Sequence, residues 1–269
     1  MTLALAASLL LMAIVQFAAA GYRWDDGHLA TEPVNWALGA KVPTLIAHGE
    51  YWRLVTASFL HGSWLHLAFN LLGLWVVGRL VEVFYGPARM LVIFVLSSVL
   101  GVVVSYCASL TTSLGASTGV MGLVGAVIWH NWKYRTLLPP RLWNAYRLLL
   151  FLVFLQFVMD LRSETVDAFG HLGGFLGGVF LATLLEGRIA GEAQGEREWL
   201  PLPTALTTTV AALVYGALGL VTTLPGSMDR LHAGAADSVA DETAYMSQIV
   251  ARRPYFTEAR LHYSLLLLP

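Results

Sequence analysis

The sequence has 269 residues, of which 57% are hydrophobic and 12% are charged, whereas roughly one quarter of the residues in a soluble domain are charged. This composition excludes an ordinary soluble globular protein. The formal net charge of -1 provides no basic surface for nucleic acid, so we expect no nucleic-acid partner. The single cysteine, Cys107, excludes an intramolecular disulfide framework.

A stretch without any charged residue lies between Arg89 and Lys133. Because a helix needs about 20 apolar residues to cross the hydrocarbon core of a bilayer, this stretch predicts two crossings. Continuous apolar runs do not alternate as barrel strands do, and lipid cannot satisfy open backbone groups, so the predicted fold class is an all-α polytopic membrane protein. Seven membrane helices are predicted, at Leu3–Ala20, Trp64–Phe84, Met90–Leu110, Ala116–Trp132, Arg147–Leu161, Ala168–Leu185 and Thr204–Leu224.

The first predicted helix ends in small residues, Ala18–Ala20. A cleaved secretory signal is therefore an open alternative to a retained helix, although the positively charged start of a signal is missing. In either case the next segment, Gly21–Ser63, lies on the far side of the membrane. Its aromatic residues predict that it lies in the membrane interface; they include Trp24, Trp36, Tyr51 and Trp52.

The basic residues predict the orientation of the helices, because short loops rich in Lys and Arg face the cytoplasm. Arg79 and Arg89 flank the turn after the second predicted helix. The loop after the fourth contains Lys133, Arg135, Arg141 and Arg147. The segments that alternate with these loops are richer in acidic residues, and we therefore expect them to face outward. Their acidic residues are Asp25, Asp26, Glu32, Asp160, Glu164 and Asp167.

Three places in the predicted helices carry polar side chains, which are costly in lipid and therefore functional candidates. The second predicted helix contains His66 and Asn70, with His61 shortly before it. His66 and Asn70 are four residues apart, so they share a helix face and can direct two donors at one point, as in an oxyanion hole. The alternatives are a polar bridge between helices or metal ligation. Asn is a poor ligand and no nearby carboxylate or cysteine completes a site, so we expect no metal.

The fourth predicted helix starts in a small-residue motif that contains Ser117. Unpaired backbone N–H groups and the helix dipole at this outward end favour an alkoxide or an oxyanion. The same segment carries a packing face for another helix, made of Gly115, Gly119, Gly122 and Gly125. Taken alone, this motif favours packing over catalysis.

The sixth predicted helix carries His171 at its outward end, followed by Gly174 and Gly178 on the same face. A single membrane histidine is most often a donor between helices. Here the glycines let another helix approach closely, and the glycine face that follows Ser117 is a natural partner. That pairing predicts a hydrogen bond between Ser117 and His171, which favours nucleophilic chemistry.

In its ordered set of motifs the chain resembles the rhomboid family of intramembrane serine proteases. The resemblance covers Leu3 to Leu185, the six-helix core of that family, and the seventh predicted helix resembles its six-plus-one arrangement. On this basis we expect a core at 1–187, a cytoplasmic linker at 188–203, a seventh helix at 204–224 and an extramembrane tail from Pro225 to 269. The motifs are Trp52-Arg53, His66-x-x-x-Asn70, Gly115-x-Ser117 and His171-x-x-Gly174-x-x-x-Gly178, with Glu82 and Gly86 also fitting.

The resemblance implies that Ser117 is the nucleophile and His171 the general base, as a dyad without a third carboxylate. His66 and Asn70 would be oxyanion donors with the Ser117 backbone N–H, and His61 would support the polar cavity. We expect the loop carboxylates, Asp160 and Asp167, to be solvated. No cofactor is implied.

Met121 departs from the family, which usually places at this position an aromatic residue that stacks on the catalytic imidazole. A thioether also packs against a ring, so the departure affects rate and substrate preference more than mechanism. Thr118, where glycine is common, is a smaller departure.

Two other functions are compatible with a polytopic protein. One is a non-catalytic rhomboid relative that binds transmembrane clients, although such relatives typically lose the serine or the histidine. The other is a transporter, which predicts broken midplane helices in matched halves of the chain, and this sequence has none. The expected partners are transmembrane protein substrates and the lipid bilayer, at a plasma or bacterial inner membrane with the site facing outward; the oligomeric state stays open.

Overall fold

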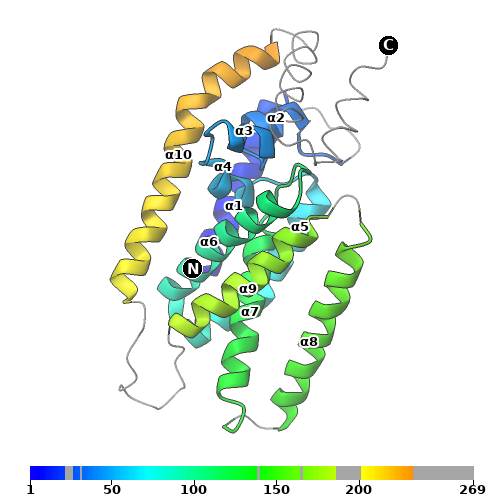
Figure 1. Ribbon diagram of the computed structural model, residues 1–269, viewed down its shortest axis with the longest axis vertical. Helices are drawn as coiled ribbons and strands as arrows, with labels where there is room; N and C mark the ends of the chain where they lie inside the picture. The colour runs from blue at the N-terminus through cyan, green and yellow to red at the C-terminus, as the bar shows by residue number, and fades with distance from the viewer. Residues whose placement is uncertain (22–26, 31, 138–139, 164–165, 186–200, 233–269) are drawn as a thin grey trace.

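The computed structural model describes residues 1–21, 27–30, 32–137, 140–163, 166–185 and 201–232. Over these residues the chain is helical and contains no strand, only the isolated bridges His28–Ser63 and Lys41–Ser113. The all-α prediction is confirmed. The long helices are α1 (Thr2–Ala19), α5 (Trp64–Gly73), α6 (Arg79–Ala108), α7 (Ser117–Lys133), α8 (Pro140–Asp160), α9 (Ala168–Leu184) and α10 (Leu202–His232). In Figure 1, α8 and α10 lie on opposite sides of a central group of α6, α7 and α9.

Among the described residues, three helical stretches are long and apolar enough to cross a membrane: Thr2–Ala19, Trp64–Ala108 and Leu202–Thr223. The second stretch joins α5, the π-helical turn η2 (Leu74–Gly78) and α6. Gly86 interrupts it with φ 80° and ψ 166°, a conformation that glycine adopts without a steric penalty. Pro87 follows and restarts the helix, since a proline in the first turn loses no hydrogen bond. Two of the predicted helices therefore meet at Gly86.

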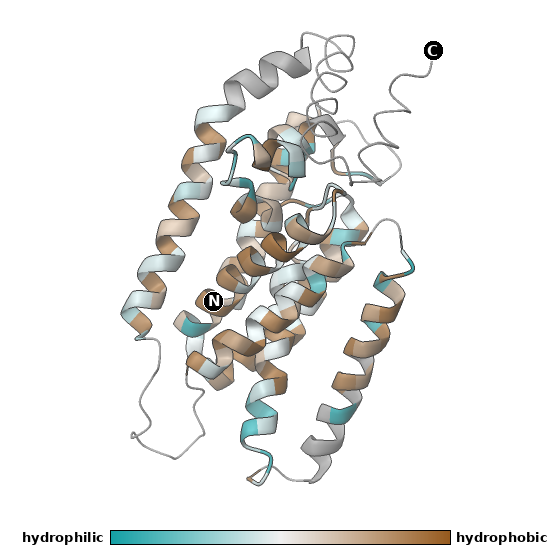
Figure 2. Ribbon diagram, in the orientation of Figure 1, coloured by the Kyte–Doolittle hydropathy of each residue, from teal (hydrophilic) through white to brown (hydrophobic). Residues whose placement is uncertain are grey.

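Many large apolar side chains of the long helices point outward. Figure 2 shows hydrophobic residues along much of α8 and α9. The exposed ones include Phe69 and Leu72 on α5, Phe151 and Phe154 on α8, and Leu218 and Val221 on α10. An apolar surface of this extent is typical of helices that face lipid.

The contact between α7 and α9 is made by backbone against backbone. A Cβ atom at Gly174 would overlap the carbonyl oxygen of Thr118, and one at Gly178 would overlap the carbonyl oxygen of Gly122. A Cβ at Gly125 would in turn overlap the carbonyl oxygen of Phe175. The glycines allow a separation that any side chain would prevent, as at small-residue helix interfaces generally.

Helix α6 is the third member of this close-packed group. A Cβ at Gly101 would come within 2.6 Å of the Gly170 carbonyl oxygen on α9. Gly119, which we expected on the face towards the sixth predicted helix, instead lies against Ser98 and Phe94 of α6. The small-residue face of α7 is thus shared between two partners, because three helices meet there and not two.

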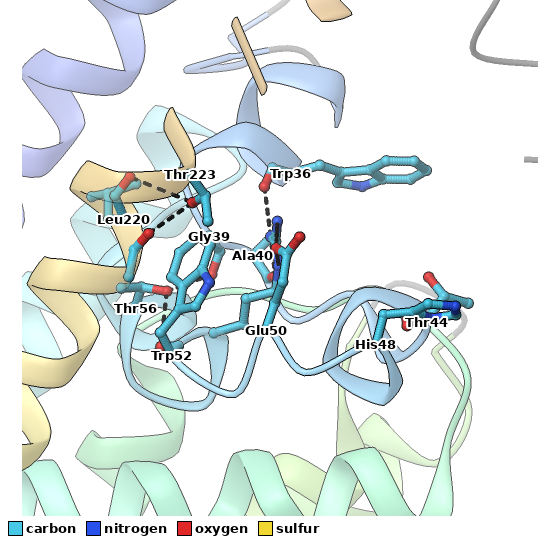
Figure 3. A network of polar contacts seen from close by, with 12 residues as sticks. Trp36, Gly39, Ala40, Thr44, His48, Glu50, Trp52, Thr56, Leu220 and Thr223 are labelled. Carbon is cyan, nitrogen blue, oxygen red and sulfur yellow. Dashed lines mark hydrogen bonds and ion pairs between the residues drawn. The ribbon is translucent and has the colours of Figure 1, made fainter. Parts of the chain in front are cut away.

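The outer segment folds into short helices, α2 (Glu32–Ala37), α3 (Pro43–Ala47), α4 (Arg53–Thr56) and η1 (Ala57–Phe59). The buried Arg53 guanidinium donates to the carbonyls of Trp36 and Ala40 and pairs with the Glu50 carboxylate. These bonds close the loop around the start of α4 (Figure 3). Arg53 is therefore a structural residue of this segment.

Trp52 connects the outer segment to α10. Its ring occupies the space that a side chain at Gly39 or at Gly219 of α10 would fill. Thr56 donates from Oγ1 to the Gly39 carbonyl at 2.8 Å, and Figure 3 shows this contact beside Thr223 of α10. Helix α10 therefore packs against the outer segment as well as α6.

Helix α10 continues past Leu224, where we expected the seventh helix to end, as far as His232, although its stretch that is apolar enough to cross a membrane ends at Thr223. A proline inside a helix removes its own N–H bond and bends the helix, which can continue beyond it. Of the expected linker (188–203) and tail (225–269), residues 188–200 and 233–269 lie outside the described residues.

Candidate active site

Ser117 and His171 lie at the starts of two adjacent helices. Ser117 is the first residue of α7, and His171 is in the first turn of α9. The Ser117 Oγ atom lies 2.7 Å from His171 Nε2. Asp167 fixes the start of α9 by accepting a hydrogen bond from the Gly170 N–H at 2.8 Å. Two residues that are far apart in sequence are thus in the geometry of a nucleophile and its base.

Gly115 shapes the turn that leads into α7. Its φ of 136° disfavours any residue with a side chain, and a Cβ there would lie 2.7 Å from the His66 ring. Glycine at this position therefore lets the His66 imidazole lie beside the Ser117 turn. Replacement by alanine would both strain the backbone and displace the ring.

His66 and Asn70 lie one turn apart on α5. Ser63 caps this helix by accepting a hydrogen bond from the His66 backbone N–H at 3.1 Å. The Asn70 side-chain nitrogen donates to the His66 carbonyl at 2.9 Å. An amide nitrogen carries two N–H groups, so this bond uses one of them.

A cavity of about 690 Å³ joins these groups. Both members of the serine and histidine pair line it, together with the expected oxyanion donors on α5 and Met121 on α7. Gln156 of α8 also lines it. Within the described residues there is no group of three His, Cys, Asp or Glu side chains that could hold a metal ion. The polar side chains that line the cavity thus include a serine hydroxyl in contact with an imidazole.

His61 lies behind His66 and does not line the cavity. It is fully buried, and its ring contacts the His66 ring edge-on at 5.2 Å between centroids. Burial, with the nearby His66 charge, lowers the pKa of His61 from 6.5 to about 3, although a backbone hydrogen bond at Phe59 acts in the opposite direction. His61 is therefore a neutral packing partner of His66 at physiological pH.

Asp160 contradicts the expectation that it is solvated. It is the last residue of α8, its side chain is 2% exposed, and its Oδ2 atom lies 2.6 Å from His171 Nδ1. Its other oxygen accepts a hydrogen bond from the Gln156 amide at 2.7 Å. The carboxylate is inside the protein because α8 ends beside α9, with its last turn facing His171.

Asp167 is likewise more buried than expected of a loop residue. Besides the Gly170 N–H, it accepts a hydrogen bond from the Ser105 hydroxyl at 2.5 Å, and Lys41 donates to the same hydroxyl group at 2.7 Å. Burial alone would raise the pKa of Asp167, but bonds from Ser105 and Ser113, the Lys41 charge and the Gly170 N–H together lower it. Asp167 is thus an ionised cap that anchors α9.

Comparison with known proteins places these residues in a family. The rhomboid domain model matches residues 48–188, from the outer segment to the end of α9. The chain belongs to the rhomboid family. With its apolar helices, this makes it an integral, multi-pass membrane protein.

Several rhomboid relatives are named as proteases. "Rhomboid protease GluP" of Bacillus subtilis is 36% identical over 180 residues, covering 67% of this chain and 34% of that protein. "Rhomboid-like protease 1" of Toxoplasma gondii is 30% identical over 197 residues, covering 70% of this chain and 61% of that protein. "RHOMBOID-like protein 5" of Arabidopsis thaliana is 33% identical, over 59% of this chain and 56% of that protein. The chain thus spans less than two thirds of the length of these relatives.

Sequence reasoning about this rhomboid site missed the contribution of α8. The signal was the spacing of Gln156 and Asp160, which are four residues apart and therefore share a helix face. Treating Asp160 as a loop residue hides this relation. The role of Lys41 was also missed, since a single lysine in the outer segment gives no indication of its partner.

Buried His61 predicts a pH dependence of stability in this rhomboid protein. Between pH 6.5 and about 3 the unfolded chain carries a proton on His61 that the folded chain does not. The free energy of unfolding therefore falls as the pH decreases through this range, by at most about 1.4 kcal/mol per pH unit for this group. Thermal unfolding in detergent between pH 7 and 5 should show a shallower decline for His61→Gln. An equal decline in both proteins would contradict the assignment.

Proposed function

We propose that this chain is a serine endopeptidase that cleaves single-span membrane proteins near the outer membrane interface. The observation that carries the proposal is the 2.7 Å contact between Ser117 Oγ and His171 Nε2 in the wall of a polar cavity. In this scheme His171 takes the Ser117 proton as Oγ attacks the scissile carbonyl carbon, and the same proton passes to the leaving amine. Water from the cavity then hydrolyses the acyl-enzyme.

Serine protease chemistry also requires that the oxyanion of the tetrahedral intermediate be stabilised. We assign its stabilisation to His66, Asn70 and the backbone N–H of Ser117. The first turn of a helix has unpaired N–H groups, and Ser117 is the first residue of α7. Donors already directed at the position of developing charge lower the barrier without reorganisation.

We infer the substrate class from a site that lies, in this proposal, at the outer ends of apolar helices. Substrate helices hide their carbonyls in hydrogen bonds, so a scissile bond must lie where the helix unwinds, at small or helix-weakening residues.

The proposed architecture is a six-helix core over 1–187, with α10 as a seventh crossing and the loop after α7 in the cytoplasm. A cysteine introduced at the exposed Arg135 should then be labelled by an impermeant thiol reagent only after sealed cells are opened. The exposed Tyr51 position serves as the outer control, and Cys107, which is also exposed, is replaced by serine in both proteins. Labelling of position 135 from outside intact cells would reverse the orientation.

A non-catalytic rhomboid that binds transmembrane clients is the alternative function. The hydrogen bond between Ser117 and His171 favours the protease, because a client-binding protein has no need for an aligned nucleophile and base. The decisive test is incubation of the full chain in membranes with single-span reporters and, separately, with a fluorophosphonate probe. Cleavage and labelling mapped to Ser117 support the protease; client binding without either supports the alternative.

A further inference from the structure

Asp160, His171 and Ser117 form a continuous line of three side chains from three different helices. Asp160 Oδ2 lies 2.6 Å from His171 Nδ1, and His171 Nε2 lies 2.7 Å from Ser117 Oγ. Asp160 is 2% exposed and His171 is 12% exposed. A nearly buried carboxylate therefore ends a chain of short contacts that leads to the nucleophile.

The contact at Nδ1 determines which imidazole nitrogen carries the proton. An ionised carboxylate only accepts hydrogen bonds, so the short contact requires a proton on Nδ1 of His171. In the neutral ring, Nε2 is then the unprotonated nitrogen that accepts from the Ser117 hydroxyl. The carboxylate thus selects the tautomer that a general base needs.

The other oxygen of Asp160 is also engaged. Gln156, one turn earlier on α8, donates to Oδ1 at 2.7 Å. The carboxylate is therefore held from both sides, by an amide of its own helix and by the imidazole of α9. These two contacts fix the orientation of the Asp160 carboxylate, with Oδ2 directed at His171.

Among the described residues, two titratable groups besides His171 line the cavity, and neither offers an alternative to Asp160. Asp167 uses its oxygens on the Ser105 hydroxyl and the Gly170 N–H. His66 also lines the cavity, but its ring lies against Gly115 and it is not a carboxylate. Among the described residues, Asp160 is the carboxylate in contact with the His171 ring.

We propose that Asp160 is a positioning residue that makes the Ser117 and His171 pair a triad. This inference rests on the proposed function. When the Ser117 O–H bond breaks and Oγ bonds to the scissile carbonyl carbon, the proton moves to His171 Nε2. Asp160 stabilises the resulting imidazolium and exchanges no proton itself; the Nε2 proton then goes to the amine nitrogen as the C–N bond breaks.

The test is Asp160→Asn in the full chain, which keeps the shape of the side chain and removes its charge. The asparagine amide can donate to Nδ1 and so select the wrong tautomer. Using a purified single-span reporter in micelles, we expect kcat to fall on the order of 10²–10⁴-fold, with KM and Tm unchanged. The rate of fluorophosphonate labelling at Ser117 should fall in parallel.

Arg162→Gln is the matched control, because it changes the charge by one unit at an exposed position close to Asp160. It should leave kcat within about twofold of wild type. An unchanged kcat in Asp160→Asn, or a raised KM at constant kcat, would overturn the proposal.

If Asp160→Asn does not fold, Gln156→Leu takes its place, since it frees the carboxylate without touching His171. We expect a several-fold lower kcat in this variant, and an unchanged value would refute the role of Asp160. If Asp160→Asn does fold, combining the two changes should cost no more than Asp160→Asn alone, because both act through one contact. Failure of the proposed function is distinguishable, because the wild-type chain would then neither cleave the reporter nor be labelled at Ser117.

Discussion

Ser117→Ala is expected to abolish cleavage and leave the fold intact. The change removes one hydroxyl from a cavity wall, so it creates no large void, but it removes the only atom in the proposed scheme that attacks the substrate. His171→Ala should have nearly the same effect, because the serine hydroxyl stays protonated without a base. The measurement is reporter cleavage in membranes by each variant and by wild type, at equal protein levels. The Tm of each variant, equal to that of wild type, shows that the fold is intact.

Asn70→Ala should lower the rate of cleavage less than Ser117→Ala or His171→Ala does. Loss of one oxyanion donor typically lowers the rate on the order of 10²–10³-fold, and His66 with the Ser117 N–H would remain. The ranking is therefore the test of the assigned roles. A folded Asn70→Ala as inactive as Ser117→Ala, or cleavage by Ser117→Ala, would require a different nucleophile or different donors.

Gly178→Val is expected to prevent the central helices from packing. A side chain there would overlap the backbone carbonyl of Gly122, which cannot move without displacing α7. Overpacking typically costs ~1–3 kcal/mol, and a clash with backbone should reach or exceed the upper value. Gly174→Val should behave similarly, because its side chain would overlap the Thr118 carbonyl. Thermal unfolding in detergent and reporter cleavage measure the two losses.

Gly73→Ala is the matched control for these substitutions. It is also a helical glycine, but its new Cβ would meet only the end of the Val120 side chain, at 3.1 Å. A side chain can move by a few tenths of an ångström, and alanine favours the helix, so Tm should change little. Wild-type stability and turnover in Gly178→Val would show that the described interface is not tightly packed.

The helices were predictable because lipid forces long apolar runs to be helical. The break at Gly86 was also readable, since a charged turn separates two apolar runs. The proximity of Ser117 and His171 was inferred from glycines on both helices, because glycines indicate close approach. The sequence could not show that Gly119 faces α6, since small residues do not identify their partner.

Asp160 shows where such reasoning fails. One residue at a helix end can point to solvent or to the interior, depending on how the last turn is rotated. That rotation follows from the packing of α8 on its neighbours, which no local pattern records. Pro225 illustrates the opposite case: a proline followed by glycine is typical of a helix end, but α10 continues past it to His232.

The backbone contact between α7 and α9 has a consequence for heat inactivation. Helices that touch through long side chains can slide as those side chains change rotamer on warming, so the distance between groups they carry drifts before unfolding. Here Gly174 and Gly178 lie directly against the main chain of α7, and neither has a rotamer to change. The spacing of Ser117 and His171 is therefore set by peptide groups in van der Waals contact. We therefore expect the proposed site to retain its geometry up to the temperature at which the helices separate, so that turnover and tertiary structure are lost in one transition.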